Sequence, residues 1–281
     1  MISSVTPNAQ RGRSNRQVAA RAKSLLDSRR STLPKAPSKW LLLAEGRAIW
    51  EAGAALALWP LLQTAPRGDG HSVLVLPGLV ADDTSTEILR HYLNGRGYDV
   101  HGWEQGRNLG PRRGVEGKMR DQLARLHADS GRRVSVIGWS LGGVYARLLA
   151  AHAPELVRNV ITLGSPLGGN PKATNAWQVY RAVSGDRGDE NGARVADLAK
   201  VPSMPATSIY SRSDAIVSWR SSLTTEGRCS ENIEVIASHL GLGAHPAVLY
   251  ALADRLAQPE GDWKPFNGAR FGRLAFPTPR A

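Results

Sequence analysis

The sequence contains a single cysteine, Cys229, so the chain cannot form an internal disulfide. It also lacks a long uncharged apolar run. The most apolar stretch, Trp40 to Leu62, is interrupted by charged residues, and its own longest uncharged run, Ala52–Pro66, has 15 residues and includes Pro60. A membrane-spanning helix needs about 20 apolar residues. We therefore expect the stretch to form a packed or interfacial helix.

The N-terminal sequence also lacks the features of a secretory signal. The basic N-terminus is not followed by an apolar segment with a small-residue cleavage site. The sequence therefore predicts a cytoplasmic protein, for which peripheral contact with a membrane stays open.

Acidic residues are scarce near the N-terminus. Residues 1–39 hold nine of the 36 Lys and Arg residues and one of the 24 acidic residues, whereas residues 40–281 are nearly balanced. The net charge of +12 thus comes mostly from an arm poor in large apolar residues, which we expect to be disordered. Its charge favours a weak contact with an anionic membrane. No specific binding to nucleic acid is expected.

The rest of the chain alternates short apolar runs with amphipathic segments. The runs predict strands, and the segments between them predict helices over 84–95, 115–131, 142–155 and 246–258. The predicted strands cover residues 71–78, 98–103, 132–138, 157–166, 205–211 and 231–238. This alternation is typical of an α/β fold with a mainly parallel sheet of about six strands flanked by helices.

The domain organisation follows from where the alternation holds. We expect one α/β domain over 40–258, which begins with a helical N-terminal extension. Residues 164–204 interrupt the pattern and are expected to form a small cap or lid insertion beyond the carboxyl ends of the strands. Residues 259–281, rich in Pro, Gly and Arg, are expected to be an extended surface tail.

A serine lies between glycines at a predicted strand-to-helix turn. The string Gly138-Trp139-Ser140-Leu141-Gly142 has the G-x-S-x-G spacing of a nucleophile elbow. A very tight turn crowds the residues two before and two after the serine, where a Cβ would clash, and Gly138 and Gly142 avoid that clash. Ser140 is the predicted nucleophile.

A serine hydroxyl needs a base to remove its proton. In the chain order serine, acid, histidine, the base follows the last strand. His239, in "EVIASHLGLG", fits this place, and His245 is its rival six residues further on. We favour His239 because the end of the strand fixes it more firmly.

The acid and the oxyanion donors complete the candidate site. Asp214 follows the fifth predicted strand and is expected to orient the histidine. Asp82 and Asp83 are expected instead to act near a helix N-terminus. The backbone N–H groups of Leu141 and Leu79 are the predicted oxyanion donors.

These motifs resemble those of the α/β-hydrolase family, in its serine lipase and esterase branch. The resemblance runs from about His71 to Gln258 and includes "GWSLGG", "LPGLVADD", "SRSDAIV", "SHLGL" and the "GSP" that ends the fourth strand. It implies ester hydrolysis through an acyl-enzyme, without a metal or cofactor. The chain departs from the family in its helical N-terminal region and in its modest insertion near 164–204.

We therefore expect a serine hydrolase that cleaves small-molecule or lipid esters through Ser140, His239 and Asp214. An acyltransferase would use the same three residues. A third reading is a non-catalytic scaffold that residues 1–39 tether to a membrane or nucleic acid, in which case Ser140→Ala would change nothing.

Overall fold

Alternating strands and helices build a central parallel sheet. A computed structural model describes residues 35–168, 174–184, 198 and 202–277, which lie in one unit spanning 35–281. The expectation for the arm therefore falls mostly outside the described residues. The strands are β1 (Ser72–Leu76), β2 (Asp99–His101), β3 (Val134–Trp139), β4 (Val157–Leu163), β5 (Ala206–Ser211) and β6 (Ser230–Val235).

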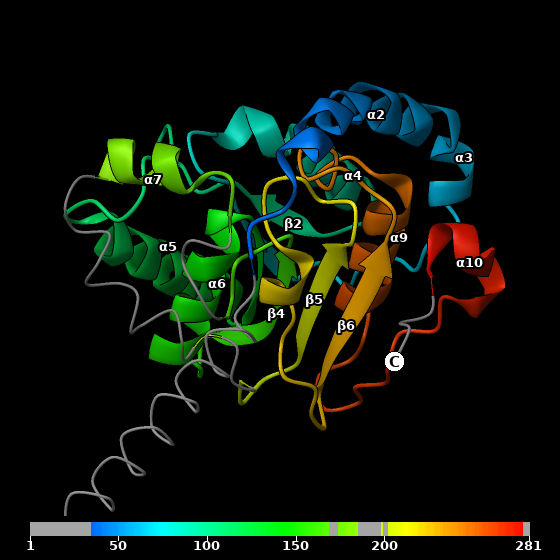
Figure 1. The fold of residues 1–281 in the computed structure, drawn as a ribbon. Helices are drawn as coiled ribbons and strands as arrows, with labels where there is room; N and C mark the ends of the chain where they lie inside the picture. The colour runs from blue at the N-terminus through cyan, green and yellow to red at the C-terminus, as the bar shows by residue number, and fades with distance from the viewer. Residues whose placement is uncertain (1–34, 169–173, 185–197, 199–201, 278–281) are drawn as a thin grey trace, which may run out of the picture. The chain divides into compact units, whose positions relative to one another are not determined.

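All five strand pairings are parallel, in the order β2-β1-β3-β4-β5-β6. Every residue of β1, β3, β4 and β5 is buried. Continuous apolar runs predict such strands because helices cover both faces of a parallel sheet. The predicted six-stranded parallel sheet is confirmed (Figure 1).

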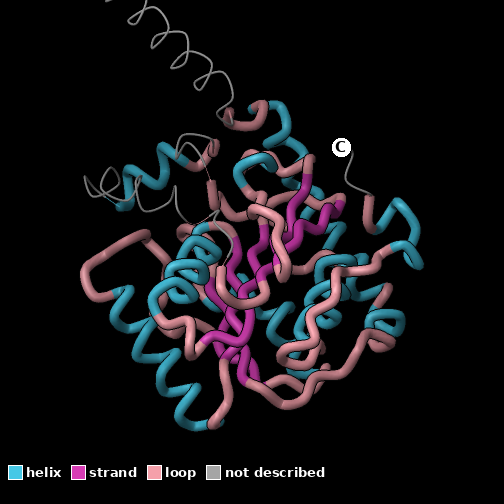
Figure 2. Tube along the Cα trace, turned by 90° about the horizontal axis from the view of Figure 1, so that it is seen from below, coloured by secondary structure: helices cyan, strands magenta, loops and turns pink. Residues whose placement is uncertain are grey.

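Helices pack on the two faces of this sheet (Figure 2). Alternate strand residues face opposite sides. Val73 and Val75 join a core cluster with α4 and α9, whereas Leu74 and Leu76 join a second cluster with α5 and α6. These helices span Glu87–Gly95 (α4), Pro246–Leu256 (α9), Val115–Ser130 (α5) and Leu141–His152 (α6).

A helical segment precedes the sheet, as the sequence predicts. It consists of the 3-10 helix η1 (Lys39–Arg47), α2 (Ala48–Ala57) and α3 (Trp59–Leu62). Ala55 and Leu62 pack into the same core cluster as α9. No helix in the described residues is long and apolar enough to cross a membrane.

The structure also describes parts of the expected cap over 164–204 and of the expected C-terminal tail over 259–281. Within 164–204 the structure describes α7 (Trp177–Ser184), and most of that insertion lies outside the described residues. At the C-terminal end, the expectation of an extended tail is wrong for residues 269–275, which form η5 (Ala269–Phe271) and α10 (Gly272–Ala275). Phe266, Phe271 and Phe276 pack on the core there, and their burial holds this segment against the domain.

Two short 3-10 helices complete the described elements. They are η2 (Asp83–Thr86) and η4 (Trp219–Ser221). As expected, Asp82 acts at a helix start, where its carboxylate accepts the N–H of Thr84 at 3.1 Å. Asp83 accepts the N–H groups of Trp103 and Glu104 and so fixes the chain that leaves β2.

Candidate active site

Ser140 forms the whole turn between β3 and α6. Its backbone has φ 54° and ψ −120°, a conformation that L-residues rarely adopt. The N–H of Ser140 donates to the carbonyl of Leu163 at 2.8 Å, which ties the turn to the end of β4. The strained residue is thus held by the flanking strands at the carboxyl edge of the sheet.

The glycines around Ser140 remove steric conflict. A Cβ on Gly138 would overlap the carbonyl of Gly142, and a Cβ on Gly142 would overlap the carbonyl of Leu76. Both obstacles are backbone atoms, which cannot rotate away. Only glycine at these two positions allows so tight a turn beside β1.

His239 and Asp214 meet directly. The distance from His239 Nδ1 to Asp214 Oδ2 is 2.7 Å, and both side chains are almost fully buried. The other carboxylate oxygen of Asp214 accepts the N–H groups of Ile216 and Val217, each at 2.8 Å. The loop that follows β5 therefore fixes the carboxylate, and the carboxylate fixes the imidazole.

Residues next to Ser140 lie close to this pair. Trp139, next to Ser140, donates its indole N–H to the carbonyl of His239 at 3.1 Å. A Cβ built on Gly164 would lie 3.0 Å from Asp214 Oδ2 and 3.1 Å from His239 Nδ1. The elbow, the end of β4 and the two loops therefore adjoin. The Ser140 hydroxyl itself forms no hydrogen bond with the described residues.

The pKa of His239 is raised above its ordinary value of 6.5. Burial of the ring opposes protonation, but the charge of Asp214, its hydrogen bond and the charge of Glu45 together outweigh burial. The site thus stabilises the imidazolium form relative to that of a free histidine.

The rival histidine has a different role. His245 precedes α9, and its Nδ1 accepts the N–H of Ala247 at 3.2 Å, so it caps that helix. Burial lowers its pKa. The acid predicted from the sequence is bonded to His239 and not to His245.

The predicted oxyanion donors lie on either side of the elbow. Leu141 begins α6, and the N–H groups of Leu141 and Leu79 have no acceptor among the described residues. A Cβ on Gly78 would lie 3.3 Å from Ser140 Cβ, so the Leu79 loop passes close to the serine.

The sequence reasoning missed Asn108, which holds the Leu79 loop. Its buried side chain donates to the carbonyl of Pro77 at 2.9 Å. Its backbone N–H donates to Ala81, and its carbonyl accepts the N–H of Val80, both at 2.7 Å. Asn108 lies in a stretch with no expected element, and an asparagine there carries no distinguishing sequence signal.

Two buried glutamates of the N-terminal segment were also missed. Glu45 accepts three backbone N–H groups from the loops that carry Asp214 and His239, and Glu51 accepts two hydrogen bonds from Ser238. Their only sequence signal is the charge that interrupts the apolar stretch Trp40–Leu62.

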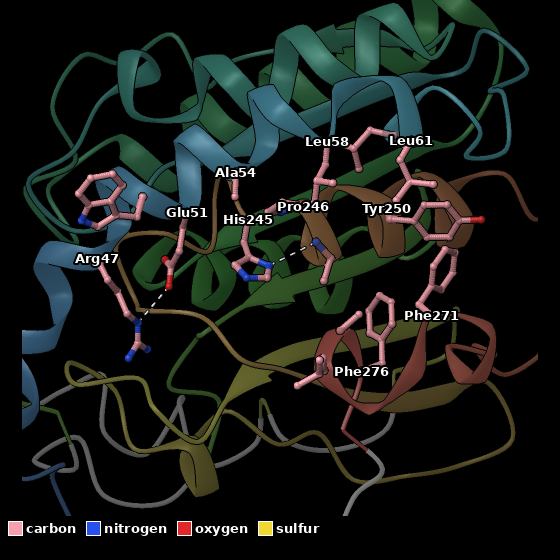
Figure 3. A pocket seen from close by; sticks show the side chains of 15 residues that line it. Arg47, Glu51, Ala54, Leu58, Leu61, His245, Pro246, Tyr250, Phe271 and Phe276 are labelled. Carbon is pink, nitrogen blue, oxygen red and sulfur yellow. Dashed lines mark hydrogen bonds and ion pairs between the residues drawn. The ribbon is translucent and has the colours of Figure 1, made fainter.

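An apolar cavity of about 550 Å³ lies behind the histidine loop, between α2, α3, α9 and α10 (Figure 3). Leu58, Leu61, Tyr250 and Phe276 line it, and Glu51 stands at its polar end beside Arg47. Ser140, Asp214 and His239 do not line this cavity. Among the described residues no three His, Cys, Asp or Glu side chains group as metal ligands.

The sheet order, the strained serine turn and the acid and histidine loops define an α/β-hydrolase fold, and solved structures agree. Lipase B from Aspergillus fumigatus is 18% identical, with a TM-score of 0.51; the match covers 69% of this chain and 54% of lipase B. A monoacylglycerol lipase from Paleococcus ferrophilus is 16% identical over 67% of this chain and 96% of its own, with a TM-score of 0.48.

A thioesterase domain from the curacin biosynthetic pathway is 12% identical over 67% of this chain and 92% of its own, with a TM-score of 0.46. No protein-family model and no curated protein matches the chain. At these identities the likeness to lipase B establishes the fold, and the chemistry must be argued from the site.

Proposed function

We propose that the protein is a serine hydrolase of carboxylic esters. The observation that carries the proposal is the buried Asp214–His239 pair, 2.7 Å between nitrogen and oxygen, at the sheet edge where Ser140 is held in a strained turn. A buried carboxylate that fixes one imidazole nitrogen leaves the other free to act as a base. The fold's frequent use for ester chemistry adds support by analogy alone.

In the proposed mechanism His239 takes the proton of Ser140 as its oxygen attacks the acyl carbonyl. Asp214 keeps the imidazole in the required tautomer and stabilises the imidazolium. The N–H groups of Leu141 and Leu79 bind the developing oxyanion. His239 then protonates the leaving alkoxide, and water hydrolyses the acyl-enzyme by the same route. These steps use no metal or cofactor.

The substrate is proposed to be a small-molecule or lipid ester. Transfer of the acyl group to an alcohol would use the same residues, and no contact in the described part of the chain favours it. Product ratios with added alcohol distinguish the two activities. The charge of residues 1–39 supports the proposal of a weak contact with anionic membranes.

The test is a chain-length series of p-nitrophenyl esters, measured with the wild type, Ser140→Ala and the control Ser130→Ala, together with labelling by a fluorophosphonate. We expect Ser140→Ala to lose activity on the order of 10⁶-fold and to lose the label. Among the described residues, Ser130 binds only backbone groups of Leu126 and Arg132 at the end of α5, so its variant should keep both activity and label. Labelling that persists in Ser140→Ala would overturn the proposal.

A further inference from the structure

Glu45 joins the two loops on which the proposed chemistry depends. Its side chain is buried, and Oε1 accepts the N–H groups of Ala215 at 3.0 Å and His239 at 3.1 Å. Oε2 accepts the N–H of Leu240 at 2.9 Å. One carboxylate thus binds the residue after Asp214 and the backbone of His239 itself.

Neighbouring side chains of the same segment extend this attachment. Glu51 accepts the N–H of Ser238 at 2.8 Å and its hydroxyl at 2.5 Å. Arg47 donates to Glu51 and, at 2.7 Å, to the hydroxyl of Ser213, next to Asp214. Hydrogen bonds to a charged group are shorter and stronger than neutral ones. The histidine and acid loops are therefore both fastened to η1 and α2.

We propose that Glu45 is a positioning residue for His239. It holds the histidine loop against the acid loop, so that the ring stays aligned between Asp214 and Ser140. This inference rests on the proposed function.

The charge of Glu45 should affect the pH dependence of kcat, because it acts on the pKa of His239. A residue with a purely structural role would leave that pH dependence unchanged. Asp214, on the acid loop, and Glu45, on η1, both favour the imidazolium of His239, while Glu51 and Arg47 flank the loop from the same segment. Glu45→Gln removes one of these charges, so the pKa of His239 should fall. The acid limb of the rate profile should then move to lower pH.

The experiment compares kcat against pH for the wild type, Glu45→Gln, Glu45→Ala and Glu231→Gln. Glu231 lies at the far end of β6, where it binds Arg255 and the N–H of Phe266. We expect Glu45→Ala to lower kcat by about 10²-fold, since small misplacements of catalytic groups are that costly. Glu45→Gln should shift the acid limb to lower pH, and Glu231→Gln should leave the limb in place.

The experiment distinguishes failure of the proposed function from failure of the positioning role of Glu45. Wild-type activity that does not depend on Ser140 would overturn the proposed function. Ser140-dependent activity with superimposed profiles for the wild type and both Glu45 variants would overturn the positioning role alone. Circular dichroism and urea midpoints confirm that the compared variants are folded.

A separate observation concerns the outward side of the same segment. There, η1, α2 and α3 expose large apolar side chains, and α10 contributes one more. Trp50 is 81% exposed and Leu274 is 89% exposed. We call this set the apolar rim; it comprises Trp40, Leu43, Ile49, Trp50, Leu56, Leu58, Leu61 and Leu274. Trp50, Leu58, Leu61 and Leu274 also border the cavity of about 550 Å³. Figure 3 labels Leu58 and Leu61 among the residues that line it.

The exposed charges beside the apolar rim are mostly basic; the acidic exception is Glu87 of α4, which lines a groove with Leu56. Within residues 35–62 both acidic side chains, Glu45 and Glu51, are buried, while Lys35 and Lys39 are exposed. Residues 264–277 contain Lys and Arg but no acid. A second copy of the chain docked symmetrically here would bring like charges together. An anionic surface would be complementary.

We infer that the apolar rim binds the surface of an anionic phospholipid bilayer. Tryptophan and leucine side chains insert at the boundary between headgroups and acyl chains, and nearby lysines attract anionic headgroups. This inference is independent of the proposed chemistry.

Vesicle sedimentation tests it, using the full chain with Ser140→Ala so that turnover plays no part. The vesicles are phosphatidylcholine alone or mixed with phosphatidylglycerol. We expect binding to the anionic vesicles, and more than about tenfold weaker binding after Trp50→Ser with Leu61→Ser, because each side chain loses its transfer into apolar surroundings. The control Val179→Ser changes an exposed residue of α7, which contributes nothing to the apolar rim, and this variant should bind normally.

Three results would overturn the inference. The first is equal binding to neutral and anionic vesicles, and the second is unchanged binding by the Trp50 and Leu61 variant. The third is a dimer, seen by light scattering, that this variant disperses, since the apolar rim would then be an interface between copies.

Discussion

Three glycines at the candidate site occupy positions where a larger side chain would overlap its neighbours. Gly138 and Gly142 face backbone carbonyls, and Gly164 faces the Asp214–His239 pair. Where the obstacle is a backbone atom, a substituted side chain has no rotamer that relieves the overlap. The packing around Ser140 therefore depends on the backbone of the neighbouring elements at the carboxyl edge of the sheet.

Gly142→Ala should destabilise the fold strongly. Its methyl would overlap the carbonyls of Leu76 and Pro77, so we expect a loss of about 3 kcal/mol in the free energy of unfolding, at the upper end of overpacking costs. Urea unfolding of the wild type and the variant measures this difference in the free energy of unfolding. The matched control is Gly117→Ala in α5, where the space is empty and alanine should stabilise the helix by up to about 1 kcal/mol. Equal stability of the two variants would contradict the steric argument.

We expect the ionisation of His239 to set the acid limb of the rate profile. The proposed base must be neutral, and its pKa is raised above 6.5, so activity should rise with pH through a midpoint above 6.5. Asp214→Asn should move the midpoint down and lower kcat on the order of 10⁴-fold. A wild-type midpoint below 6.5 would contradict this assignment of charges.

The same shift has a consequence for stability. A pKa that is higher in the folded than in the unfolded chain adds stability that is complete below the unfolded value, near 6.5. That contribution disappears as pH rises through the folded pKa. Activity and this part of the stability therefore change in opposite directions with pH.

The sequence predicted Ser140, His239 and Asp214 but not Glu45. The first three sit at strand ends, and the ends of parallel strands meet at one edge, so their proximity follows from the element order. Glu45 reaches His239 across 194 positions of sequence. Its partners are backbone N–H groups, which carry no side-chain signature, so no local pattern indicates the contact.

For the helices and strands, burial explains why the strand predictions are confirmed and why the prediction of an extended C-terminal segment is wrong. The strands were predictable because strands covered on both faces are rich in apolar residues, as in Ser72–Leu76. The C-terminal segment was expected to be extended because Pro, Gly and Arg dominate its composition. Three phenylalanines outweighed that composition, because all three pack on the core cluster. Phe271 contacts Tyr250 of α9 at 4.4 Å between ring centroids, and Phe276 contacts both Phe266 and Phe271.

The loop that carries Leu79 is fastened by one side chain. Asn108→Ala removes the hydrogen bonds to the carbonyl of Pro77 and from the N–H of Gly110. A displaced oxyanion donor should lower kcat by up to about 10²-fold. The lost bonds should cost about 1–3 kcal/mol of stability.

The matched control for this change is Asn232→Ala. Its amide likewise binds a loop, through both backbone groups of Thr224 at 2.9 Å. It should lose similar stability without the specific loss of kcat. If both variants keep wild-type kcat, the loop does not depend on Asn108 for its catalytic geometry.

At the scale of the whole molecule, Asp69 ties together the start of three strands. Its carboxylate accepts the N–H of His71 before β1, and pairs with Arg132 before β3 and with the buried Arg158 of β4 at 3.0 Å. Partial burial raises its pKa, but the hydrogen bonds from His71, Arg158 and Arg132 prevail, so its pKa is held well below the usual value.

Asp69→Asn should therefore reduce stability in a pH-dependent way. A depressed carboxyl pKa contributes stability that is complete above the unfolded value, about 3.9, and is lost as pH falls toward the folded pKa. The difference in urea midpoint between wild type and variant should be largest near neutral pH and should narrow below about pH 4. A difference that stays constant between pH 7 and pH 3 would show that the charge is not what stabilises this junction.

The buried glutamates also bear on where this chain can be shortened. The resemblance to hydrolases begins near His71, yet a fragment cut just before β1 would leave the amides of Ala215, Ser238, His239 and Leu240 without their carboxylate acceptors in the interior. Such a fragment would keep every strand and all three proposed catalytic side chains. We expect it to be inactive all the same, because the smallest working unit of the proposed enzyme would extend upstream to Glu45 in η1.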